Sequence, residues 1–226
     1  MDLLVQPSPP ALETPHPTTR DMTRSRRTQA ERAALSEDRL LDAALRLISE
    51  RGWAGTSLQA IGDAAGYSRG LVSHRFGSKE GLLWALLERI FAHWDSSRLS
   101  PAVEGRVGVE ALHAAIEATR QAMHAAPERL RAFYALLFES LGPLGALRPK
   151  VAEFHRRQRA AVAGWIEAGI RAGNVPPEVD AATQAALFMS ALRGASYQWL
   201  IDPENVDIDA IYDEIKKTFT RTLGGS

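Results

Sequence analysis

Residues 68–76 carry side chains that could bind a polyanion. Arg69, Gly70, Ser73 and His74 fall on one side of a short helical segment. An arginine there could donate two hydrogen bonds to guanine O6 and N7, and a histidine could contact a phosphate. A face of small, polar and basic side chains can enter the major groove of DNA, which is about 12 Å wide. This segment therefore indicates binding to a double helix.

The flanking residues predict two short helices that would hold this face. Residues 56–59 fit a capping box, in which a hydroxyl is followed three positions later by an amide side chain. Ala65 is a small residue where the two helices would cross, and Gly66 allows a sharp bend. Val72 and Phe76, four residues apart, would point inward. Two short helices joined by a glycine-containing turn predict a helix-turn-helix.

Helical periodicity continues over most of the chain, and strand-like alternation is missing. We predict a first helix from a cap at Ser36 to Gly52, and a fourth helix from a cap at Ser78 toward Arg98. Later helices are expected at residues 107–125, 128–141, 149–172, 178–201 and 207–222. The sequence thus predicts an all-α protein with three parts. These are a disordered arm with prolines and arginines at 1–35, a helix-turn-helix DNA-binding domain at 36–82 and a helical body at 83–226.

The stretch from Thr56 to Leu83, which ends in a Phe-x-x-Lys-Glu pattern, resembles the DNA-binding head of the TetR family of bacterial transcriptional regulators. In that family the start of the second helix, most of the third helix and a lysine that begins the fourth face the duplex. The resemblance therefore implies DNA contacts from Thr56, Ser57, Gln59, Ser68, Arg69, Gly70, Ser73, His74, Arg75 and Lys79. Two positions depart from the pattern, since Ser73 stands where many members have tyrosine and Gly62 stands where alanine is usual.

Several of these residues also have a simpler role. Thr56, Ser68 and Ser78 are expected to cap helices, so a DNA contact would be an additional function. Gln59 could be the amide of the capping box or could pair with adenine N6 and N7. Lys79 lies at a helix N-terminus, where free backbone N–H groups favour a phosphate. The arm could enter a minor groove or stay idle, and its basic residues include Arg24, Arg26 and Arg27.

Composition excludes several other classes of protein. The 226 residues include 27 basic and 27 acidic side chains and no cysteine, which removes disulfides, zinc–thiolate sites and thiol nucleophiles. No apolar run is long enough to span a bilayer, and no secretory signal pattern is present, so we expect a cytoplasmic protein. Nucleophile-elbow, phosphate-loop and His-Glu-x-x-His motifs are missing. We therefore expect no enzyme, no cofactor and no metal site.

Aromatic side chains are spread through the predicted body. Taken singly, each is more often part of a hydrophobic core, but together they could wall a cavity for an apolar or aromatic small molecule. The candidate pocket residues are Trp84, Phe91, Trp94, Phe133, Phe138, Trp165, Met189 and Tyr197.

The family resemblance implies that the body at 83–226 is an effector-binding and dimerisation domain. It implies a homodimer joined through the last two long helices, 178–201 and 207–222, and the first of these is too apolar to face water. Two recognition helices predict a pseudo-palindromic operator. We expect a repressor that leaves this operator when a small hydrophobic ligand tilts the fourth helix. Two alternatives stay open. One is a DNA-binding regulator without a small-molecule effector, and the other is an all-α enzyme or lipid carrier.

Overall fold

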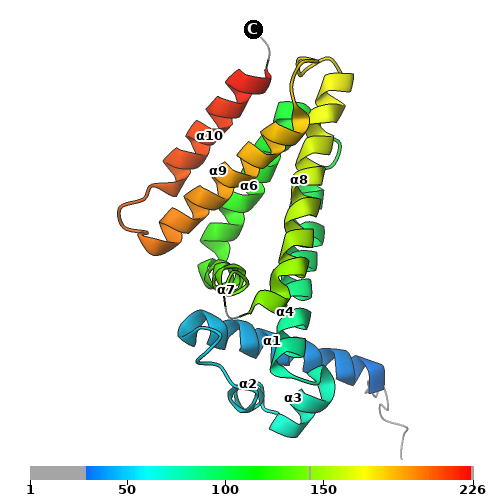
Figure 1. Cartoon of the computed structure of the whole chain (residues 1–226), viewed down its shortest axis with the longest axis vertical. Helices are drawn as coiled ribbons and strands as arrows, with labels where there is room; N and C mark the ends of the chain where they lie inside the picture. Colours follow the sequence, from blue (N-terminus) through cyan, green and yellow to red (C-terminus); the bar gives the residue numbers. More distant parts are fainter. Residues whose placement is uncertain (1–28, 143, 225–226) are drawn as a thin grey trace, which may run out of the picture.

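A computed structural model describes residues 29–142 and 144–224, and within them it contains helices and turns but no strand (Figure 1). The all-α prediction is therefore confirmed. The helices are α1 (Gln29–Arg51), α2 (Leu58–Ala65), α3 (Arg69–Phe76), α4 (Lys79–Trp94), α5 (Ser100–Val103), α6 (Gly108–Ala125), α7 (Pro127–Glu139), α8 (Arg148–Arg171), α9 (Ala181–Ile201) and α10 (Ile208–Leu223). A π-helical turn, η1, spans Asp95–Leu99, and a 3₁₀ turn, η2, spans Gly145–Leu147.

The first helix begins earlier than predicted. It starts at Gln29, and Ser36 lies inside it, where its hydroxyl donates to the carbonyl of Ala33. Residues 29–35 are mostly alanine, glutamine, glutamate, arginine and leucine, which favour helix. The predicted cap at Ser36 is wrong for this reason, and residues 29–35 are helical. The remainder of the predicted arm, with Arg24, Arg26 and Arg27, lies outside the described residues.

The later helices follow the predicted ranges closely. Each of the five body helices begins and ends within three residues of its expected position. The fourth helix departs more, because α4 passes at Asp95 into the π-helical turn and then into α5, so the helical run reaches Val103. None of the described helices is long and apolar enough to cross a membrane.

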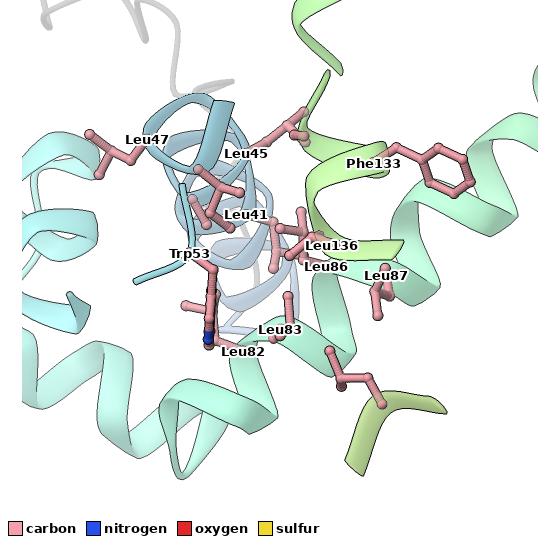
Figure 2. Packing of buried hydrophobic residues seen from close by; sticks show 14 of the residues in the cluster. Leu41, Leu45, Leu47, Trp53, Leu82, Leu83, Leu86, Leu87, Phe133 and Leu136 are labelled. Carbon is pink, nitrogen blue, oxygen red and sulfur yellow. The ribbon is translucent and has the colours of Figure 1, made fainter. Parts of the chain in front are cut away.

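Side chains of α1, α4 and α7 form one shared hydrophobic core (Figure 2). Leu41 of α1, Leu83 and Leu86 of α4, and Leu136 of α7 are all buried in it. Burial of each such leucine contributes about 1.5–3 kcal/mol. The predicted domain boundary after residue 82 falls inside this core. Because α7 packs directly on α1, a shift of α7 would reach the helix-turn-helix without passing through a loop.

A second core lies between α6, α8, α9 and α10. Leu112, Phe188 and Tyr212 are buried there, and the Tyr212 and Ser196 hydroxyls form a hydrogen bond of 2.8 Å. Figure 1 shows α9 and α10 side by side at the outside of this core. The described residues leave one face of α9 exposed, with Leu187, Tyr197 and Ile201 on it.

Candidate nucleic-acid interface and ligand pocket

The turn between α2 and α3 is built as the sequence predicts. Gly66 ends α2 with φ 77°, a left-handed conformation that glycine adopts without strain. Ser68 begins α3, and its hydroxyl accepts a hydrogen bond of 3.3 Å from the backbone N–H of Leu71. Val72 points into the core and is fully buried. The geometry holds α3 as a short, well-capped helix whose opposite side faces outward.

The closest approach of α2 to this turn is made by Gly62. A Cβ atom added to Gly62 would lie 2.7 Å from the carbonyl oxygen of Tyr67 and 3.3 Å from a methyl group of Val72. The Tyr67 N–H also donates to the Gly62 carbonyl over 2.8 Å. Ala65, which we expected at the crossing, is only partly buried. Gly62, where the family pattern has alanine, therefore leaves room for the turn backbone and for Val72 of α3.

The predicted capping box at residues 56–59 is wrong. Ser57 is the residue that caps α2, and its hydroxyl accepts from the N–H of Ala60. Thr56 is buried, and its hydroxyl donates to the carbonyl of Gly52 over 2.8 Å. Gln59 donates instead to the carboxylate of Asp63, one turn along the helix. The hydroxyl of Thr56 is thus committed inside the fold and does not face a duplex in this structure.

Six of the ten predicted contact residues are exposed and gathered on the outer side of α2 and α3. We call these six the exposed helix-turn-helix face: Ser57, Gln59, Ser68, Arg69, Gly70 and His74. Ser73 lies beside them and is half-buried. The face offers hydroxyl, amide, imidazole and guanidinium groups, which are donors that suit phosphate oxygens and base edges.

Arg75 and Lys79 have structural partners in addition to any DNA contact. Arg75 reaches back to α1, with 3.4 Å to the Glu37 carboxylate and 3.3 Å to the Ser36 hydroxyl. The Lys79 ammonium donates to the carbonyl of Trp53 over 2.8 Å and lies 4.2 Å from the centre of the Trp53 ring. Burial lowers the pKa of Lys79. Arg75 ties α3 to α1, Lys79 ties the start of α4 to the turn after α1, and their DNA contacts stay predictions.

A pocket of about 560 Å³ opens between α7, α8 and α9. Its walls are largely leucine, valine and aromatic side chains. The polar and aromatic groups that face it are Tyr134, Phe138, Arg148, His155, Arg193 and Tyr197. The volume lies within the range of about 300–1,000 Å³ that is usual for small-molecule sites.

Two of the eight predicted pocket residues, Phe138 and Tyr197, line this pocket. Phe91 and Phe133 are buried in the first core, where the rings of Phe91 and Phe154 stack 3.8 Å apart. The other four are half-buried against one of the two cores, which places them elsewhere: Trp84, Trp94, Trp165 and Met189. These six residues do not line this pocket, because each ring or thioether lies in or against a hydrophobic core.

The family model for bacterial regulatory proteins of the tetR family matches residues 40–86, which include α2, α3 and the start of α4. Residues 40–86 thus form a helix-turn-helix region of the TetR family type. Over 70 residues it is 44% identical to the HTH-type transcriptional regulator CymR of Pseudomonas putida, which is 31% of this chain and 34% of that protein. Over 51 residues it is 47% identical to the HTH-type transcriptional regulator BetI of Burkholderia thailandensis, covering 23% and 26%. The chain thus matches about a third or less of these relatives' length.

Solved structures of TetR proteins share the fold over nearly the whole chain. A TetR transcriptional regulator from Chloroflexus aurantiacus matches with a TM-score of 0.77 and 22% identity, over 86% of this chain and 99% of that one. A transcriptional regulator from Saccharomonospora viridis, solved in complex with choline, matches with a TM-score of 0.74 and 20% identity, over 85% and 100%. The chain therefore shares the fold of these regulators although its sequence differs from theirs.

Sequence reasoning missed the polar residues of the pocket, above all Arg193. A signal was available, because Arg193 is the single charged residue of α9. A single charged side chain in an otherwise uncharged helix is expected either to face solvent or to lie at a binding site. Arg193 lines the pocket.

Proposed function

We propose that this chain is a sequence-specific regulator of transcription of the TetR family and places α3 in the major groove of an operator. The observation that carries the proposal is the exposed helix-turn-helix face, which stays free of the core while Val72 and Ile61 are fully buried beneath it. A protein with this function acts in the cytoplasm. No observation favours an all-α enzyme or a lipid carrier.

Replacing Arg69 tests the proposed base contact. With duplexes selected from a random pool by the wild-type protein, Arg69→Ala should weaken binding by about 1–3 kcal/mol and relax the preference at one base pair. Fluorescence anisotropy measures both effects. Arg171→Ala is the matched control, because Arg171 is an exposed arginine at the far end of α8 and should leave affinity unchanged.

The salt dependence of DNA affinity is a second test. Wild-type affinity should fall about 1,000-fold or more between about 50 and 200 mM salt, since bound phosphates release counterions. Equal losses for Arg69→Ala on every sequence would make Arg69 a phosphate contact and not a base reader. Failure of the wild-type protein to bind any duplex at low salt would contradict the proposed function itself.

We propose further that the protein is a homodimer joined mainly through α9. Leu187 and Ile201 of α9 are 54% and 69% exposed, and Tyr197 lies between them with 42% exposure. These residues recur at helical spacing along one side of the helix, so they form an apolar stripe. A two-fold axis through the stripe would pair two helix-turn-helix units, which requires a pseudo-palindromic operator.

The pocket between α7, α8 and α9 is the proposed effector site. Tyr134, Leu137 and Phe138 of α7 line it, while Ala132 and Leu136 of the same helix pack into the core shared with α1. A ligand that displaces α7 would therefore move α1 and the half-site spacing with it. Such a ligand must bind the DNA-free state more tightly, with a coupling of about 1–3 kcal/mol. The output we propose is repression that the ligand relieves.

A further inference from the structure

Arg193 is a partly buried cation that has the Tyr134 hydroxyl as a polar neighbour but no acidic partner among the described residues. Its Nε atom is inaccessible to solvent and makes no hydrogen bond to any described residue. Its guanidinium carbon lies 5.2 Å from the centre of the Phe133 ring and 5.5 Å from that of Phe154. Within the described chain no carboxylate comes within 4.0 Å of it. Burial lowers the pKa of Arg193, which is the expected effect of removing a charge from water.

The rest of the pocket adds positive charge and supplies no negative charge. Arg148 lies at its edge, and none of the side chains that line the pocket is an aspartate or glutamate. Burial, together with the charges of Arg193 and Arg159, lowers the pKa of His155 to about 4. His155 is therefore neutral at pH 7 and can donate one hydrogen bond without repelling Arg193.

An unpaired buried charge is costly, and proteins usually give it a counter-ion or a functional role. The aromatic rings under Arg193 offset part of this cost. Arg193 lines the pocket, where a ligand could supply the missing anion. The pocket walls also include apolar and aromatic side chains, namely Leu137 and Phe138 on α7 and Tyr197 on α9.

We propose that the pocket binds an organic acid with an apolar, preferably aromatic, body and that the carboxylate of this acid pairs with Arg193. A guanidinium presents parallel N–H donors that match a carboxylate in two places, whereas an amide or an ammonium has no such match. The proposal rests on the proposed function in taking this pocket as the effector site. It also separates this chain from the Saccharomonospora viridis regulator solved with choline, because choline is a cation.

Three compounds of nearly equal shape test the charge preference on the full chain: 2-naphthoate, 2-naphthamide and 2-naphthylmethylammonium. Isothermal titration calorimetry at pH 7 should show the acid binding about tenfold or more tighter than the amide, with the ammonium weakest. Benzoate and octanoate extend the series to a smaller and to an aliphatic body. If none of the three acids binds with a Kd below about 1 mM, or if the amide equals its acid, the proposal is wrong.

Variants of Arg193 test whether this residue causes the preference for acids over amides. Arg193→Met should bring the affinity for the acid down to that for the amide, while the amide affinity stays within about twofold. Arg193→Lys keeps the charge without the planar fork, so it should keep a reduced preference and remain informative if the methionine variant fails to fold. Arg159→Met is the matched control, because Arg159 is exposed on α8 near His155 and does not line the pocket. An acid preference that survives in a folded Arg193→Met protein would overturn the assignment.

The two proposals fail separately. Calorimetry of acid binding needs no DNA, so loss of duplex binding with intact acid binding contradicts only the regulator function. Conversely, a protein that binds its operator but shows no preference for acids contradicts only the ligand class. Adding 2-naphthoate to the protein–operator complex then reports whether occupancy of the pocket lowers DNA affinity.

Discussion

Replacing both Leu187 and Ile201 with glutamate is expected to convert the protein to a monomer and to weaken operator binding about 100-fold or more. These two side chains are the most exposed apolar residues of α9. Two glutamates on each copy would place like charges against each other across the two-fold axis. A monomer binds only one half-site, and loss of the linked second site removes a factor of about 10²–10⁴ in affinity. Analytical ultracentrifugation gives the mass, and fluorescence anisotropy gives the affinity.

The control adds the same two negative charges on another helix. Ala160→Glu and Ala161→Glu alter exposed residues of α8, and the double variant should remain dimeric with DNA affinity changed only slightly. Binding to a duplex with a single half-site should be weak and similar for both proteins. A Leu187→Glu, Ile201→Glu protein that stays dimeric would move the interface away from α9.

The structure indicates that α9 and α10 contribute differently to the proposed dimer interface. The exposed residues of α10 are mostly charged or threonine, and Lys217 pairs with Glu214 over 3.1 Å while Arg221 lies 3.4 Å from the same glutamate. The apolar residues of α10 pack inward against the second core, as Tyr212 and Phe219 do. We therefore expect α9 to supply the apolar centre of the dimer contact and α10 to supply charged groups at its edge.

Local signals predicted the helix-turn-helix well because its geometry is set by neighbouring residues. Gly66 adopts the left-handed conformation, and Ser68 and Ser78 each accept a hydrogen bond from a backbone N–H three residues later. The helix cap before α2 could not be assigned in the same way. Thr56 and Ser57 are adjacent hydroxyl residues that can both cap a helix, and burial of Thr56 with its bond to Gly52 leaves Ser57 as the cap.

The pocket was harder to predict because it depends on contacts between distant helices. Aromatic type alone does not say which ring fills a core and which borders a space, so Phe133 and Phe138 looked alike in sequence. In the structure Phe133 is 7% exposed and Phe138 is 50% exposed, although they lie on the same helix. The charge of Arg193 was a better indication of the pocket, since burial of a cation costs free energy and burial of an aromatic ring does not.

Gly62→Ala is expected to destabilise the protein by about 1–2 kcal/mol, although alanine is the better helix former. In an open helix this change stabilises by about 0.5–1 kcal/mol. Here the added Cβ would lie 2.7 Å from a backbone oxygen of Tyr67, and relief requires α3 to move away from α2. Overpacking of this kind typically costs about 1–3 kcal/mol, so the clash exceeds the gain. Thermal and urea unfolding measure the difference.

Gly164→Ala is the matched control, because Gly164 lies inside α8 and an added Cβ there meets no atom within 4 Å. This variant should gain up to about 1 kcal/mol, so the same substitution has opposite signs at the two positions. Operator affinity adds a second measurement, since a displaced α3 also misplaces Arg69 and His74. Gly62→Ala should therefore weaken DNA binding at temperatures where the protein is still folded, whereas Gly164→Ala should not. A Gly62→Ala protein more stable than wild type would show that α3 can shift freely, and the close contact at Tyr67 would then not position the exposed helix-turn-helix face.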